Sequence, residues 1–132
     1  AVTALFENRE LAASVSDKLK VYAQPQRLMI LSCLLRGERN VAEIGETTGI
    51  GQPALSQQLA ESRRGELVST RKEAKQVYYA LVNEGVGLCV RSMEAIFGGA
   101  DGSASASTVM RPAPKAPAKI TIPGAANFAK IL

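Results

Sequence analysis

The chain has 132 residues with a formal net charge of +4, and 46% of them are hydrophobic, which suits one domain with a buried core. No apolar run approaches the roughly 18 residues of a membrane span, and no charged start leads into an apolar signal region, so we expect a cytoplasmic protein. Histidine is absent, which removes the commonest metal ligand and the usual general base.

Residues 1 to 22 are expected to form a first helix, because apolar residues recur there at three- and four-residue spacings with charged residues between them. Ala23-Gln24-Pro25 interrupts this pattern, and proline suits the first turn of a second helix. That helix is almost entirely apolar from Arg27 until it ends at Gly37. We therefore predict it to be the central helix of the core.

Residues 41 to 65 predict two short helices separated by a glycine turn. The first ends before Gly49, which can adopt the positive φ that such a turn needs. The second begins near Gln52-Pro53, buries leucines at helical spacing and ends at Gly65. Several polar residues of this second helix fall elsewhere on its circumference, free to contact another molecule.

Residues 68 to 72 and 76 to 81 are β-branched and aromatic runs around the charged tip Glu73-Ala74-Lys75, which predicts a β-hairpin. Helix, tight turn, polar-faced helix and basic hairpin together predict a winged helix-turn-helix. In that fold a recognition helix enters the major groove of DNA and the hairpin, or wing, lies along the phosphates. The expected fold class is mainly α with a small β-hairpin wing (α+β), in the order α-α-α-α-β-β-α.

Asn83 could cap a last helix that runs to about Phe97 and carries one apolar face. A terminal amphipathic helix of this kind often pairs with a partner's copy, so we expect a homodimer through the first and last helices. From Gly98 onward the composition changes to small residues and proline. We therefore expect a domain over residues 1–97 and a disordered or extended tail over residues 98–132.

The overall charge is a weak indication of DNA binding, because four basic residues and one acidic residue of the tail leave the folded part near +1. A local grouping is the better indication, since phosphate binding needs charge concentrated on one surface. Such a grouping occurs near the end of the second short helix and in the hairpin. It consists of Arg63, Arg64, Arg71, Lys72 and Lys75.

Three motifs carry a family resemblance. PQRLMIL at 25–31 has the pattern P-x-R-L-x-I-L, and VYYAL at 77–81 matches a second wing strand. QPALSQQL at 52–59 is similar to Q-x-x-[VL]-S-x-H-L, with Gln58 where histidine is common. Residues 18 to 97 thereby resemble the ArsR/SmtB family of bacterial winged-helix repressors, and most closely its thiol-sensing and rhizobial nodulation-repressor branches. The resemblance implies a dimer that binds an inverted repeat of double-stranded DNA and, in most members, releases it when a metal or thiol-reactive inducer binds.

Within this fold, DNA contacts are expected from the second short helix and from the wing. Glutamine can pair with adenine N6 and N7, and serine can serve a base edge or a phosphate. Wing cations would bind the backbone and set the register rather than read sequence. The alternative is that these side chains are ordinary solvated surface. The predicted contacts are Gln52, Ala54, Ser56, Gln57, Arg63, Arg71, Lys72 and Lys75.

Metal sensing is disfavoured, and neither a metal site nor a cofactor is expected. The zinc and nickel sensors of the family that the chain resembles use paired histidines and carboxylates, and this chain has no histidine. The arsenic and cadmium sensors use a cysteine pair, and the matching stretch from Glu43 to Gly49 has none. The thiol-sensing members place one cysteine on the core helix and one at the end of the last helix. Cys33 and Cys89 lie in those helices but not in register. Both also fit core packing, and a bridge between them would need a Cα separation below about 7 Å.

Three interpretations therefore stay open. The first is a DNA-binding repressor released when an oxidant or reactive sulfur species modifies Cys33 and Cys89. The second is the same kind of regulator without a small inducer, and the third is a winged-helix module for protein interaction. An enzyme is not expected, because the sequence has no histidine, phosphate loop or plausible nucleophile–base pair.

Overall fold

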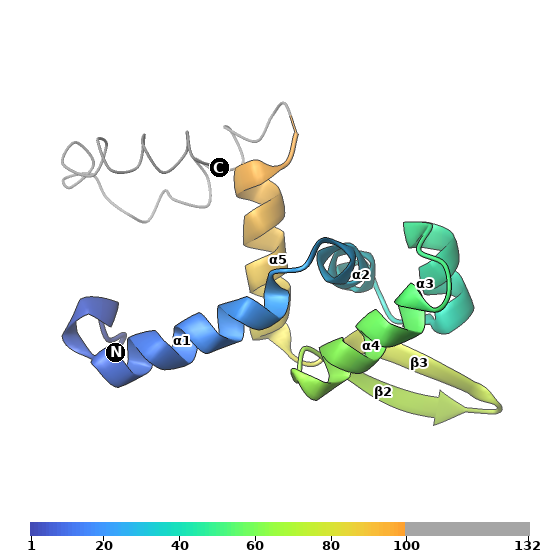
Figure 1. The fold of residues 1–132 in the computed structure, drawn as a ribbon, viewed down its shortest axis with the longest axis horizontal. Helices are drawn as coiled ribbons and strands as arrows, with labels where there is room; N and C mark the ends of the chain where they lie inside the picture. The colour runs from blue at the N-terminus through green and yellow to red at the C-terminus, as the bar shows by residue number, and fades with distance from the viewer. Residues whose placement is uncertain (100–132) are drawn as a thin grey trace. The chain divides into compact units, whose positions relative to one another are not determined.

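The computed structural model describes residues 1–99. Contacts along the chain separate a first unit, Ala1–Arg91, from a second that begins at Ser92. No helix among the described residues is long and apolar enough to cross a membrane. The elements follow in the order η1 (Leu5–Glu7), α1 (Arg9–Tyr22), α2 (Pro25–Leu35), β1 (Arg39–Asn40), α3 (Val41–Thr48), α4 (Ala54–Arg64), β2 (Val68–Glu73), β3 (Gln76–Leu81) and α5 (Glu84–Phe97) (Figure 1).

The predicted α-α-α-α-β-β-α order is confirmed, with one short addition at each of two places. The first helix is shorter than the expected 1 to 22: α1 begins only at Arg9, because Asn8 ends the 3-10 turn η1 and caps α1. Its side-chain oxygen accepts a hydrogen bond of 2.9 Å from the backbone N–H of Leu11. The second addition is β1, whose two residues are too few to leave a pattern in the sequence.

The core forms around α2, as its apolar sequence predicts. Ile30 and Leu31 of this helix and Ile44 of α3 have 0% of their surface exposed. Leu55 and Leu59 of α4 are also buried, at the helical spacing that the sequence shows. Burial of these side chains holds α2, α3 and α4 together and so sets the orientation of α4.

Local signals define both ends of α3. At its start Asn40 and Glu43 form a capping box, in which each side chain accepts a hydrogen bond from the other's backbone N–H, at 2.8 and 2.9 Å. At its end Gly49 adopts a φ of +76°, which confirms the predicted glycine turn. The turn leads directly into α4, so these signals fix where the second helix of the pair begins.

The three strands form one antiparallel sheet in the order β1-β3-β2. Its register aligns Asn40, Tyr78 and Arg71 across the sheet, and likewise Arg39, Tyr79 and Thr70. Because side chains alternate between the faces of a strand, the sheet has two sets of residues. The inner face, which includes the buried Val68, carries Val68, Thr70, Lys72, Val77, Tyr79 and Leu81. The outer face carries Ser69, Arg71, Glu73, Tyr78 and Ala80.

The last helix begins as predicted, with the side-chain oxygen of Asn83 accepting a 3.0 Å hydrogen bond from the backbone N–H of Val86. Val86 and Val90 are buried, whereas Leu88 on the same helix is 59% exposed. Within α1, Tyr22 is buried and Leu19 is exposed. The tail expected from residue 98 lies, beyond residue 99, outside the described residues.

Candidate nucleic-acid interface

One side of α4 is buried and the other is open, as the sequence predicts for a recognition helix. The buried side consists of Leu55, Gln58, Leu59 and Ser62. Of the predicted contact residues, Gln52, Ser56, Gln57 and Arg63 are exposed and Ala54 is half-buried. The exposed residues offer amides, a hydroxyl and a guanidinium, which are groups that can bind base edges and phosphates.

A polar connection holds the buried side of α4 to α2. Gln58 is only 9% exposed, and its side-chain oxygen accepts a 3.1 Å hydrogen bond from Nε of Arg27. Arg27 also donates to the backbone oxygen of Val21 at 2.8 Å. The fully buried hydroxyl of Ser62 donates to the backbone oxygen of Gln58 at 2.8 Å. All three bonds satisfy polar groups inside the domain, and the bond between Arg27 and Gln58 joins α2 to α4 and so restricts rotation of α4 about its own axis.

The side chain of Gln52 caps the first turn of α4. Its Oε1 accepts hydrogen bonds from the backbone N–H of Ser56 at 3.2 Å and from the Ser56 hydroxyl at 2.7 Å. The backbone N–H can only donate, so the Gln52 atom facing it is the oxygen. The NH₂ group of Gln52 can therefore donate to an acceptor on another molecule. Gln57 is exposed, and both its side-chain oxygen and its NH₂ group can bond to another molecule.

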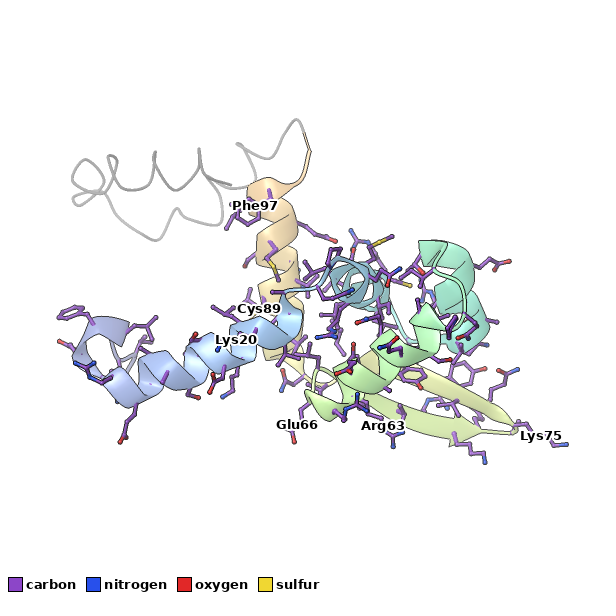
Figure 2. The ribbon with its side chains drawn as sticks, in the orientation of Figure 1. Lys20, Arg63, Glu66, Lys75, Cys89 and Phe97 are labelled. Carbon is purple, nitrogen blue, oxygen red and sulfur yellow. The ribbon has the colours of Figure 1, made fainter. Side chains whose placement is uncertain are left out.

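The hairpin predicted as the wing lies along α4 (Figure 1). Figure 2 shows Lys75 at the hairpin tip and Arg63 near the opposite end, where α4 finishes. Lys72, Lys75 and Arg63 are exposed. Within residues 1–99 none of the three forms an ion pair, so their charges are available to an anion.

Arg71 differs from the other wing cations because it is already paired. Its Nε and Nη2 donate to the two carboxylate oxygens of Glu38 at 2.7 and 2.8 Å. Its Nη1 donates to Glu73 at 2.5 Å, and its guanidinium lies 4.7 Å from the ring centre of Tyr78. The hydrogen bond from Arg71 lowers the pKa of the Glu38 carboxyl. Arg64 is likewise paired, with Glu61 at 2.8 Å.

A hollow of about 490 Å³ separates α4 from the inner face of the sheet. Leu59, Ala60 and Tyr79 supply an apolar floor, while Ser56 and Arg63 supply polar groups. The remaining lining residues are Val41 and Arg64. The hollow places the inner face of β3 opposite the exposed side of α4, so the two surfaces face the same space.

The two cysteines lie in different environments. Cys33 is 5% exposed in the core, as packing predicts, whereas Cys89 is exposed on α5. Cys89 contacts the side chain of the buried Tyr22, and burial together with this contact raises the pKa of Tyr22 to about 12. Among the described residues, no group of three or more histidine, cysteine, aspartate or glutamate side chains could hold a metal ion.

Comparison with known proteins assigns the chain to a family. Residues 24–70 match the family model described as bacterial regulatory protein, arsR family. The chain is 40% identical to the biofilm growth-associated repressor of Xylella fastidiosa over 65% of its own length and 75% of that protein. The chain belongs to the ArsR family. Another ArsR-like relative is nodulation protein NolR of Rhizobium meliloti, 36% identical over 70% of this chain and 73% of that protein.

Solved structures agree with this assignment. The repressor BigR from Xylella fastidiosa has a TM-score of 0.64 at 36% identity, covering 71% of this chain and 93% of that one. Reduced HlyU from Vibrio cholerae also reaches 0.64 at 36% identity, covering 69% and 96%. A homodimeric winged helix-turn-helix DNA-binding domain from Mycobacterium bovis reaches 0.59 at 28% identity, covering 73% and 87%. The ArsR family is one of regulatory proteins, so the chain is not an enzyme.

Two residues that matter for this interface were not among the predicted ones. Gln58 stood out in the sequence as a replacement for a common histidine, but its bond to Arg27 joins residues 31 positions apart. Glu38 carried no sequence signal at all, because its partner Arg71 lies 33 positions away. Such pairs can be found only once the fold brings them together.

Proposed function

We propose that this ArsR-family chain is a dimeric, sequence-specific DNA-binding repressor that acts on an inverted-repeat operator in the cytoplasm. The observation that carries the proposal is the exposed polar side of α4, which lies beside a wing with unpaired lysines. The name of one relative, the biofilm growth-associated repressor of Xylella fastidiosa, supports repression as the outcome of binding.

Exposed apolar side chains support the dimer. Leu19 on α1 and Leu88 on α5 are large hydrophobic residues that remain open to solvent in a single chain. A terminal helix with such a surface gains free energy when a second copy covers it. The related Mycobacterium bovis domain is described as homodimeric. A dimer would present two copies of α4 to two half-sites, which fits an inverted repeat.

The residues divide by chemistry into base-reading and phosphate-binding groups. Gln57 has a complete amide and can make the paired contact with adenine N6 and N7. Gln52 is restricted to donating, because its oxygen closes the start of α4. It suits acceptors such as guanine O6 and N7 or thymine O4. Arg63, Lys72 and Lys75 would bind phosphates, with Ala54 close to the bases.

The test is a binding isotherm on DNA selected from a random duplex pool. Gln57→Ala and Ser56→Ala should reduce discrimination between selected and scrambled duplexes by about 1–3 kcal/mol for each bidentate base pairing that the substitution removes. Ser69→Ala, on the outer face of the sheet, is the control and should leave discrimination unchanged. Unchanged discrimination in the α4 variants would show that α4 does not read sequence. Failure to select any sequence would favour the protein-interaction alternative.

Release by thiol chemistry is a second proposal, which Cys89 favours because it is exposed. The related HlyU has been solved in a form described as reduced. An oxidant or persulfide donor should then weaken operator binding reversibly, and Cys89→Ser and Cys33→Ser should each abolish the response. Equal binding by treated and untreated protein would instead support a regulator without a small inducer.

A further inference from the structure

Arg71 lies on the side of the wing that faces away from α4. Adjacent residues of a strand point to opposite faces, so Arg71 and Lys72 cannot both face the recognition helix. Lys72 shares the inner face with Tyr79, which lines the hollow beside α4. Arg71 pairs in register with Tyr78 on the outer face. The two neighbouring cations therefore have different surroundings.

The contacts of Arg71 span the whole width of the sheet. The guanidinium belongs to β2, lies over the ring of Tyr78 on β3, and reaches Glu38, which directly precedes β1. A third contact joins it to Glu73, two residues along the same face. We call Arg71, Glu38, Glu73 and Tyr78 the wing clamp. Its two carboxylates already outnumber its one guanidinium, so a DNA phosphate would have to displace them.

The clamp lies where the three-stranded sheet narrows to two strands, and there the wing has few other contacts to stabilise it. β1 pairs only with Tyr78 and Tyr79, so residues 72–77 form a ribbon of two strands. An isolated two-stranded ribbon is only marginally stable in water. Exposed ion pairs are weak when isolated, and the side chains of Arg71 and Glu38 are 49% and 35% exposed. Bidentate geometry and contact with an aromatic ring strengthen this pair.

We propose that Arg71 is a positioning residue of the wing rather than a phosphate contact. Through Glu38 it ties the outer face of the wing to the turn before β1, and it leaves phosphate binding to Lys72 and Lys75. The clamp reduces the number of wing conformations that DNA must otherwise order on binding. The inference rests on the proposed DNA-binding function and assigns to Arg71 and Glu38 a role within it.

The first test compares the salt dependence of operator binding by the full chain. Each phosphate contact contributes about 0.9 to the slope of log K against log salt. Lys72→Gln removes one such contact from each protomer of the dimer, so it should lower the slope by about 1.8, whereas Arg71→Gln should leave the slope unchanged while weakening binding. Arg71→Lys keeps the charge but not the bidentate geometry, so it should fail to restore affinity. A slope that falls as much in Arg71→Gln as in Lys72→Gln would overturn the proposal.

The second test uses the sign of the effect at Glu38. Removing a negative charge near DNA should by itself tighten binding, but loss of the clamp should weaken it by roughly three- to tenfold, in the lower part of the range for coupled neighbours. Glu38→Gln combined with Arg71→Gln should bind no worse than either single variant. Glu46→Gln, exposed on α3, is the charge-matched control and should not weaken binding. Tighter binding by Glu38→Gln would mean that Arg71 binds a phosphate and that Glu38 competes with the phosphate for it. That result would overturn the proposal.

Amide hydrogen exchange in the free protein separates this inference from the proposed function. Glu38→Gln and Arg71→Gln should accelerate exchange in the outer hairpin to the same extent, with α4 unaffected. If the wild-type chain bound no DNA, the proposed function would fail while this readout still decided whether the clamp orders the wing. Unchanged exchange in both variants would exclude the clamp.

Discussion

The recognition helix α4 and the wing are the two halves of the proposed DNA surface, yet they are held in opposite ways. Leu55 and Leu59 bury α4 against the core, and Gln58 bonds to Arg27 in a largely enclosed position. The outer wing has no comparable burial and is tied by the half-exposed pair of Arg71 and Glu38. Water and salt screen the second kind of contact far more than the first.

This difference indicates a division of tasks. A helix that reads base edges must hold its rotation about its axis, which buried contacts from several side chains can enforce. A wing that follows phosphates needs only an approximate direction, since phosphate contacts carry charge rather than sequence. We expect disturbances of the core to act on α4 and disturbances of charge to act on the wing.

The largest effect should come from removing a buried side chain of α4. Leu59→Ala should lower the free energy of unfolding by about 2–5 kcal/mol, because it leaves a cavity where a side chain only 2% exposed was packed. Val77→Ala on the half-buried inner face of the wing is the comparison, and it should cost less because it removes a smaller and less buried side chain. Denaturant unfolding at one protein concentration measures both. Equal losses would contradict the contrast between the two regions.

A smaller loss is expected from Gly65→Ala at the end of α4. A Cβ at this position would overlap Cγ1 of Val21, a short branched side chain with little room to move. Overpacking of this kind costs about 1–3 kcal/mol. Gly51→Ala is the control, because a Cβ there meets no atom within 4 Å. If the two variants were equally stable, α1 would not pack against the end of α4 as described.

Alkaline pH should lower the free energy of unfolding through ionisation of the buried Tyr22. Burial, and then its contact with Cys89, raise the pKa of Tyr22 to about 12 from an ordinary value of 10.0. The neutral phenol is favoured in the folded state, so its contribution is fully present below about pH 10 and is lost as the pH rises through about 12. A tyrosinate absorbance titration of wild type and Tyr22→Phe isolates this group. If the step that Tyr22→Phe removes lay near pH 10 rather than near 12, the assignment would be wrong.

Acid should weaken the wing clamp by protonating Glu38, and this change should have the smallest effect on overall stability. The hydrogen bond from Arg71 holds the pKa of Glu38 below its ordinary value of 4.5. The contribution of the clamp is therefore present above about pH 4.5 and is lost as the pH falls through the lowered value. An NMR titration of the Glu38 carboxyl should show this pKa moving back toward 4.5 in Arg71→Gln. A pKa unchanged by that substitution would separate Glu38 from Arg71.

Sequence patterns predicted the elements of the site better than the contacts between them. The caps at Asn83 and Gly49 and the leucine spacing of α4 are local features, and the structure confirms them. The sequence placed Arg71 and Lys72 in one basic cluster, although a strand sends neighbours to opposite faces. It also marked Gly65 as a helix end, whereas the approach of Val21 explains why a side chain would not fit there.

Local sequence patterns were enough to predict the five helices, the two hairpin strands, the central place of α2 and the resemblance to the ArsR family. These depend on caps, turns and hydrophobic periodicity, which act within a few residues of one another. Only the folded chain shows that β1 joins the sheet, that Gln58 binds Arg27 and that Arg71 binds Glu38. Each of these joins residues more than thirty positions apart, and no local pattern encodes a partner at that distance.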